Sequence, residues 1–302
     1  MLVFLMTCGE CSDAWMPGAC KGAAARQGTH QGEAVPLSTG SSSAEGSKEM
    51  IRDLKIDTTN RYPSVVMLTV HEASMNGSEV ECSGILIAPR LVLTAASCMH
   101  TKQQPTAPSR GTGVTLDATA CAVRATVTFV TYAEPLSGED LRSVITEYKG
   151  RVRCHPHFKM VLSRDGRIAS SVADLAVVTL ETAVKDVVPF SLVESAAKAG
   201  EALKVVGYTR NPEWGGIHRR RLFSQGEGLE AASPAEGVFL MNRALQPTDA
   251  GLGGGPCFRE VGGNLGLVGI INRRTSEYAM LTDVQFHKGW LSNEIRQAES
   301  QE

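Results

Sequence analysis

Short apolar runs recur along the chain from about residue 51, and Gly, Pro and Asp separate them. Within a run, hydrophobic residues either alternate with polar ones or follow one another directly, and both patterns are typical of β-strands. Many short strands at this spacing predict an all-β sandwich or barrel. The expected strands lie at 64–70, 83–88, 90–96, 125–132, 150–154, 175–180, 202–209, 237–242, 265–272 and 278–284.

The hydrophobic period changes near the end of the chain. In VQFHKGWLSNEIRQAE, residues 284–299, the apolar Phe286, Trp290, Leu291 and Ile295 fall on one face at helical spacing. The pattern therefore predicts a terminal α-helix over about 286–299.

The first fifty residues lack both patterns, and we expect a leader (1–50) that ends in a flexible linker. Residues 21–50 are rich in Gly, Ala and Ser and have no apolar period. The start, MLVFLMTCG, is apolar but shorter than a secretory h-region and lacks a basic n-region. LMTC is similar to a bacterial lipobox, which would make Cys8 a lipidation site and a membrane tether, although Thr7 fits poorly. A longer leader, cut short by an internal Met start, and a chance apolar run both stay open.

Composition narrows the classes of function. The chain has 302 residues and a formal net charge of −2, which argues against a general nucleic-acid or membrane-surface role. The basic clusters HRRRLF (218–223) and Arg273-Arg274 are typical of solvated loops. No later segment has the roughly eighteen apolar residues of a membrane span.

Cysteine usage indicates the compartment. The eight cysteines are scattered along the chain, which favours disulfides in an oxidising environment. CGEC near the start is a lone CxxC motif, so we expect no metal and no other cofactor. The protein is expected to be exported, whether extracellular, periplasmic or attached to the envelope.

Several motifs follow one another in a fixed order. They are RYPSVVMLTV, CSGILIAPRLVLTAASC, RVRCHPHF, VADLAVVTLETAV, GEALKVVGYT, GLGGGP, and LGLVGIIN followed by YAMLTDV and the Trp290 helix. Over about residues 56–298 this order resembles the chymotrypsin/trypsin family of serine proteases, peptidase family S1. The resemblance implies a trypsin-like double six-stranded antiparallel β-barrel with a C-terminal α-helix. The domain would span 51–302, with the first barrel at about 60–185 and the second at about 200–285. Closed barrels also remove exposed strand edges.

The resemblance also implies disulfides. Cys82 and Cys98 match the family's bridge beside the catalytic histidine, and closing this loop is worth about 3 kcal/mol. Cys121 and Cys154 fall in segments expected to be neighbouring strands of the first barrel, which predicts a second bridge. A Cys11–Cys20 bridge stays open, and Cys257 would be a buried free thiol if Cys8 is lipidated.

The family's chemistry needs a serine nucleophile, a histidine base, an orienting aspartate and two backbone N–H donors. By the resemblance, Ser97 stands at the histidine position, Gly253 at the nucleophile position and Asp174 at the aspartate position. A serine hydroxyl cannot act as a base near neutral pH, and glycine has no side chain. The oxyanion donors would be the amides of Gly251 and Gly253. His100 would project from a neighbouring turn, too far displaced for catalysis.

Further departures from the family concern activation and specificity. Leu252 stands where an aspartate would pair with a new N-terminal amine, and LKIDTTN stands where an Ile-Val-Gly-Gly start would supply that amine. The specificity pocket would involve Pro247, Asn272 and Arg273.

Three interpretations follow. The first is a non-catalytic binding or regulatory protein, a pseudoprotease that holds a protein or peptide ligand in its cleft. The second is an active S1-family endopeptidase that uses an unrecognised nucleophile. The third is a decaying gene copy with no partner. The broken triad favours the first interpretation, in which the chain is not an enzyme.

Overall fold

The described part of the chain comprises most of the region expected to be folded. The structure is a computed structural model, in which residues 1–42 and 43–302 form separate units. The expected leader, with Cys8, Cys11 and Cys20, and Pro247 lie outside the described residues. The described residues, all within the second unit, are 55–70, 80–100, 114–133, 143–163, 168–209, 220–228, 234–242, 251–274 and 278–300.

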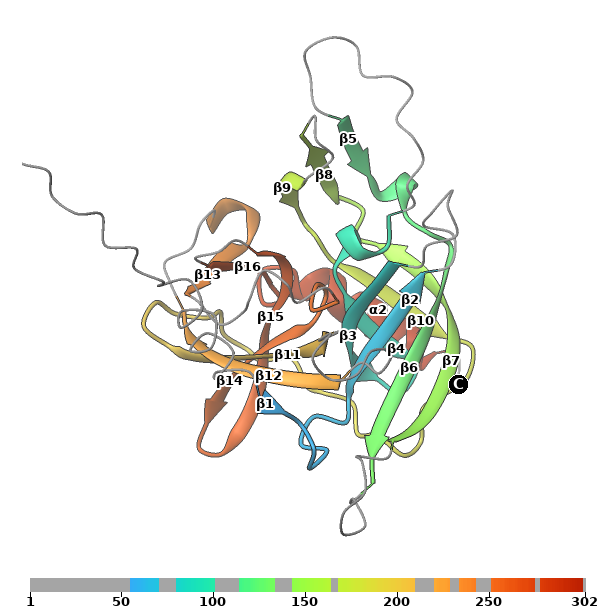
Figure 1. Cartoon of the computed structure of the whole chain (residues 1–302). Coiled ribbons are helices and arrows are strands. Elements are labelled where there is room, and N and C mark those ends of the chain that lie inside the picture. Colours follow the sequence, from blue (N-terminus) through green and yellow to red (C-terminus); the bar gives the residue numbers. More distant parts are fainter. Residues whose placement is uncertain are drawn as a thin grey trace, which may run out of the picture. The chain divides into compact units, whose positions relative to one another are not determined.

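A closed barrel of six antiparallel strands forms the first half of this region (Figure 1). Its strands follow the order β10-β4-β3-β2-β6-β7. Continuous apolar runs become strands here because both faces are covered: all of β4 is buried, and β2 has one half-buried residue. The strands are β2 (Val65–Val70), β3 (Val80–Ala88), β4 (Leu91–Thr94), β6 (Arg124–Tyr132), β7 (Ser143–Cys154) and β10 (Ala176–Leu180).

A seven-stranded antiparallel sheet forms the second half, in the order β1-β12-β11-β14-β15-β16-β13. The predicted fold class is confirmed: a mostly β protein with a six-stranded barrel, a second large sheet and a C-terminal helix. The second sheet differs in detail from a regular six-stranded barrel, because β1 joins it and only an isolated bridge links Gly228 to Met241. Its strands are β1 (Lys55–Ile56), β11 (Ala202–Thr209), β12 (Arg220–Glu227), β13 (Val238–Asn242), β14 (Pro256–Val261), β15 (Asn264–Arg274) and β16 (Tyr278–Asp283).

A third sheet was not expected from the sequence. It contains β5 (Val114–Asp117), β8 (Lys159–Leu162) and β9 (Ile168–Val172) in the order β5-β8-β9. Its strands are short and half-exposed, so they lack the apolar runs that mark the barrel strands. Figure 1 shows them beyond one end of the barrel, and β9 leads the chain directly to Asp174.

The terminal helix α2 spans Lys288–Glu299. Leu291 packs into the barrel core, and Trp290 and Ile295 are half-buried against it. Phe286 precedes the helix and is 52% exposed, because Asp283 accepts the N–H groups of residues 285 and 286 and forms a turn there. The predicted face therefore begins one turn later. Among the described residues, no helix is long and apolar enough to span a membrane.

Two disulfides confirm the expected pairings, Cys82–Cys98 and Cys121–Cys154. The fifth described cysteine, Cys257, is free and buried. Two bridges in one domain indicate an oxidising, non-cytoplasmic environment.

A buried ion pair joins the start of the domain to the second sheet. Arg221 on β12 is fully buried, and its Nε lies 2.7 Å from Asp57 Oδ2. The same guanidinium donates to the carbonyl of Val130 in the first barrel at 3.0 Å. Asp57 also accepts the N–H groups of Arg61 and Tyr62. A solvated loop was expected at HRRRLF, and for Arg221 this is wrong, because these partners satisfy its charge inside the protein.

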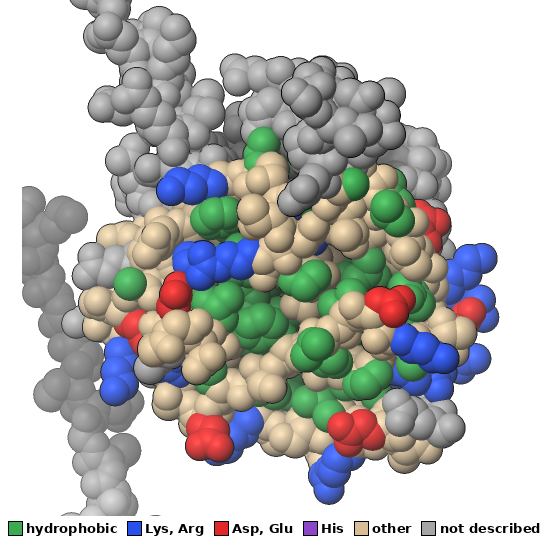
Figure 2. All heavy atoms as spheres, turned by 90° about the horizontal axis from the view of Figure 1, so that it is seen from below, with side chains coloured by type: hydrophobic (Ala, Val, Ile, Leu, Met, Phe, Trp, Pro, Cys, Tyr) green, Lys and Arg blue, Asp and Glu red, His purple; other side chains and the backbone are tan. Residues whose placement is uncertain are grey.

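Figure 2 shows the molecule from below, with apolar side chains gathered near the centre of this face. Lys, Arg, Asp and Glu side chains lie around them, with both signs interspersed. Charge of one sign therefore does not dominate this described face.

Candidate functional site

Asp174 lies between β9 and β10 and is 1% exposed. Its Oδ1 accepts the backbone N–H of Ser97 at 2.7 Å, and its Oδ2 has no hydrogen-bond partner among the described residues. Burial raises the pKa of Asp174 to about 6, and the Ser97 N–H opposes this shift. The carboxyl group therefore keeps its proton more readily than an exposed aspartic acid.

Ser97 is held beside Asp174 by the turn that follows β4. The turn is a short 3₁₀ helix, Ala96–Cys98, and the disulfide at Cys98 anchors it to β3. His100 follows this helix, and its Nδ1 hydrogen-bonds to the carbonyl oxygen of Ser97. A carbonyl only accepts, so Nδ1 carries the proton and the imidazole is held on the backbone of the turn. The 2.7 Å hydrogen bond to the Asp174 carboxyl group comes from the backbone amide of Ser97 and not from an imidazole.

A second polar contact reaches Asp174 from the other half of the domain. The Thr282 hydroxyl on β16 donates to the Asp174 carbonyl oxygen at 3.4 Å. Asn272 on β15 is buried, and its Nδ2 donates to Thr282 Oγ1 at 3.1 Å. The structure therefore links Asn272, expected at the specificity pocket, to Asp174 through a hydroxyl.

The glycine-rich turn 251–255 lies against the same disulfide. A Cβ on Gly253 would lie 3.4 Å from Cys98 Sγ, next in sequence to Ser97. Ser83 fixes the turn, because its N–H donates to the Gly253 carbonyl and its hydroxyl to the Gly251 carbonyl, each at 2.8 Å. The positions expected for the three triad residues are thus gathered at one place between the two halves.

Leu252 within this turn and Cys257 just after it are both buried. Leu252 packs at Gly207 of β11, where a Cβ would lie 2.7 Å from its Cδ2. An apolar side chain suits that site, whereas a carboxylate without a partner would be costly there. Burial also raises the pKa of the Cys257 thiol far above its usual value, so this thiol is unreactive near neutral pH.

Two contributors to the site were missed from the sequence. Ser83 and Thr282 are isolated hydroxyl residues within strands, and nothing in their local pattern marks a polar role. Their contacts depend on which distant segments meet. Of the expected pocket residues, Pro247 and the Arg273 side chain lie outside the described positions.

A barrel and a second sheet that meet at a buried aspartate and a glycine turn define a protein of the trypsin type. Comparison with protein families agrees: the trypsin-like peptidase domain matches residues 82–270, more than half of the chain. The chain therefore belongs to the trypsin-like peptidase domain family. None of the curated proteins compared with the sequence matches it.

Proposed function

We propose that this chain is a non-catalytic member of its family, which binds a protein or peptide ligand in the cleft without cutting it. The observation that carries the proposal is the bond from the Ser97 N–H to Asp174 Oδ1. In a serine-protease triad the aspartate orients an imidazole, which then serves as the base. Here that bond holds a serine against the carboxyl group, so no imidazole stands there and Asp174 Oδ2 has no partner among the described residues.

The nucleophile position supports the same proposal. Gly253 has no side chain, and the nearby Cys257 is fully buried with a raised pKa. Loss of the nucleophile or the base alone costs roughly 10⁶ in rate in a comparable enzyme. With neither group available at Ser97 or Gly253, peptide hydrolysis would not reach a useful rate.

What remains of the site suits binding. The amides of Gly251 and Gly253 donate to no acceptor in the described part of the chain, and Gly251 has a φ of +103°. Adjacent unpaired amides around a left-handed residue form a nest for a carbonyl oxygen or an anion. A peptide carbonyl is therefore the group that we expect there. We also propose that the protein is exported, and that Cys8, if it is lipidated, tethers the protein to a membrane.

The catalytic half of the proposal is tested with a fluorophosphonate serine-hydrolase probe on the full chain, read by intact mass. A thiol-alkylating probe is applied in parallel, and an active trypsin-like protease serves as the positive control. We expect no fluorophosphonate adduct on the folded chain, and we expect the thiol probe to reach Cys257 only after denaturation. A stoichiometric fluorophosphonate adduct on one residue would reveal an unrecognised nucleophile and overturn the proposal.

The binding half is tested by titrating a random library of capped hexapeptides and measuring retention on the immobilised full chain. Gly253→Leu should reduce retention, because its side chain would enter the space above the turn. Gly253→Ala is the matched control, since its Cβ meets nothing closer than 3.4 Å. Equal retention by all three proteins would contradict binding at this turn.

A further inference from the structure

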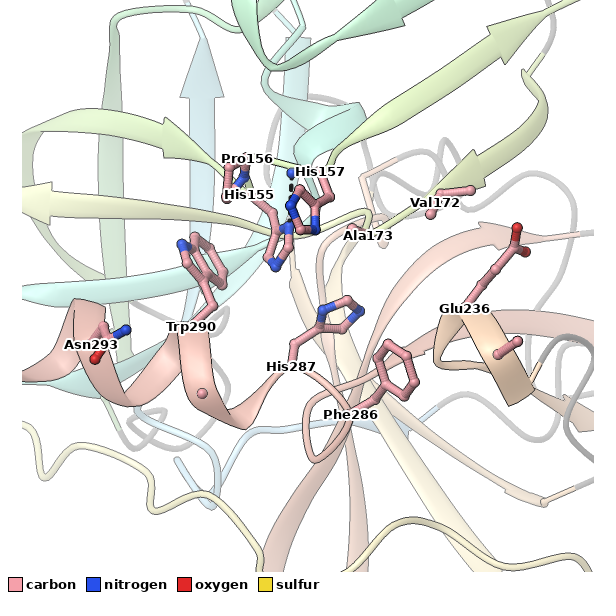
Figure 3. Close-up of a pocket in the computed structure, with 12 residues that line it drawn as sticks. His155, Pro156, His157, Val172, Ala173, Glu236, Phe286, His287, Trp290 and Asn293 are labelled. Carbon is pink, nitrogen blue, oxygen red and sulfur yellow. Dashed lines mark hydrogen bonds between the residues drawn. The ribbon is translucent and has the colours of Figure 1, made fainter. Parts of the chain in front are cut away.

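One pocket, which we call the histidine pocket, has a volume of about 600 Å³, within the range of small-molecule sites. It lies where the turn before β8, the end of β9 and the start of α2 meet (Figure 3). Ala173 is part of its wall and directly precedes Asp174, but the Asp174 carboxyl does not line it. The residues that define it here are His155, His157, Ala173, Phe286, His287 and Trp290.

Aromatic rings form a continuous wall in this pocket. The His155 ring centroid lies 4.8 Å from that of His287 and 4.7 Å from that of Trp290, in edge-to-face geometry. Phe286 stacks edge-on against His287 at 5.0 Å and is 52% exposed at the rim. Such walls favour another flat aromatic ring, which can pack edge-to-face or offset against them.

The His155 and His287 imidazoles are neutral near pH 7. Burial is the main cause that lowers the pKa of both His155 and His287 to about 4. A neighbouring histidine also disfavours the protonation of each ring. Glu236 is the one carboxylate that lines the pocket among the described residues. The pocket therefore has no cationic wall that would require an anionic ligand.

Two ring nitrogens remain for a ligand. The His157 N–H donates to His155 Nδ1 at 3.1 Å, so the neutral His155 ring carries its proton on Nε2. Figure 3 shows the His155 ring directed toward the space between Trp290 and His287. His287 is 7% exposed, and its Nε2 is buried with no hydrogen-bond partner in the described part of the chain. A buried polar atom without a partner is costly and indicates that something else bonds to it.

A metal ion is disfavoured at these nitrogens. A ring nitrogen that bears a proton cannot act as a metal ligand, and the His157 N–H keeps the proton of His155 on Nε2. Within the described ranges, no group of three His, Cys, Asp or Glu side chains is arranged to hold a metal.

We propose that the histidine pocket binds a phenol-type ring, whose hydroxyl accepts from His155 Nε2–H and bonds to His287 Nε2. A hydroxyl both donates and accepts, so it satisfies His287 in either tautomer, whereas a carbonyl only accepts and an ammonium only donates. The aromatic wall receives the ring. This binding is independent of the glycine turn, so the two proposals can fail separately.

The test compares N-acetyl-tyrosinamide with N-acetyl-phenylalaninamide, which differs by the hydroxyl alone, by calorimetric titration of the full chain. Leaving a buried polar group unpaired is costly, so the tyrosine compound should bind at least about fivefold more tightly. p-Cresol and a tyrosine-containing hexapeptide separate two sources of the ring. Tightest binding of p-cresol indicates a free phenol, tightest binding of the hexapeptide indicates a peptide side chain, and both support the pocket chemistry.

Variants localise the binding. His287→Phe keeps a ring but removes one of the two nitrogens that bond to the hydroxyl, so the preference for the hydroxyl should fall. Phe286→Ala, at the exposed rim, should weaken both compounds by a similar factor and keeps the test decisive if His287→Phe does not fold. Val188→Ala is a control at a side chain that is 84% exposed outside the pocket. Equal affinity for both compounds in the unmodified chain, no binding of either, or an unchanged preference in His287→Phe would each overturn the proposal.

Discussion

Asp174 carries a buried carboxyl group, and ionisation of this group lowers the stability of the folded protein. Its pKa is about 6 in the folded protein against an ordinary value of 3.8. The stability that its protonated form contributes is therefore fully present below pH 3.8 and is lost as the pH rises through 6. Asp174→Asn cannot ionise and should lose this dependence. Relative to the unmodified protein, its free energy of unfolding should rise by about 3 kcal/mol between pH 3.5 and pH 8.

Urea unfolding at the two pH values checks this prediction. His155 and His287 have lowered pKa values, so their contribution is present above pH 6.5 and is lost as the pH falls through 4. They act equally in both proteins and cancel in the difference. Asp186→Asn, at an exposed side chain, serves as the control. Parallel pH profiles for Asp174→Asn and the unmodified protein would contradict the assignment.

The glycine turn contains two neighbouring residues, of which one tolerates a side chain and the other does not. Gly254 has a φ of +77°, and a Cβ there would lie 2.1 Å from Thr94 Oγ1 and 2.3 Å from the Ser83 carbonyl oxygen. Gly254→Ala should therefore lower the free energy of unfolding by at least about 2 kcal/mol, from left-handed strain and overpacking together. Gly253→Ala should cost less than about 1 kcal/mol. Chemical denaturation of both variants measures these two losses in the free energy of unfolding. Similar losses would show that the turn is not held as described.

At the scale of elements, strand β1 is fixed by charge as well as by sheet pairing. Removing one partner of a buried pair leaves an uncompensated charge, which costs about 3–5 kcal/mol. Asp57→Asn should show a loss of this size, because Arg221 is fully buried. Arg61→Gln is the matched control, since Arg61 pairs with Glu260 at 3.5 Å and the two side chains are 48% and 42% exposed, so this change should cost less than about 1 kcal/mol. Thermal unfolding of the two variants should therefore differ clearly, and equal midpoints would refute a structural role for the pair.

The elements also show what the sequence can reveal. Strand β4, LVLT, is buried throughout. A strand that is buried on both faces has a nearly continuous apolar sequence, which can be recognised directly. Strand β9, IASSV, is half-exposed, and β8 is its one partner among the described strands, so its sequence carries little signal. Burial, rather than strand formation itself, is what the hydrophobic pattern records.

For the whole molecule, the site also contains residues that the sequence reveals and residues that it does not. Asp174, Ser97 and Gly253 could be proposed because each lies in a local motif of the resembled family. Thr282 meets Asp174, and His287 meets His155, only after distant segments fold together. Their roles depend on tertiary packing, which no single window of the sequence contains. The ion pair of Arg221 was missed for the same reason, because an isolated basic run is usually solvated.

Repair of the triad tests how the whole domain supports chemistry. Gly253→Ser is sterically allowed, since a Cβ there lies 3.4 Å from Cys98 Sγ, and Ser97→His would place an imidazole in the turn beside Asp174. The double variant should still hydrolyse fluorogenic peptides with kcat/KM below about 10 M⁻¹ s⁻¹, against roughly 10⁴ or more for typical enzymes. Leu252 is buried against Gly207, so this position supplies no carboxylate for the ion pair that would order the pocket. Robust turnover would show that the pocket is ordered without that pair, and the block would then lie in Ser97 and Gly253 alone.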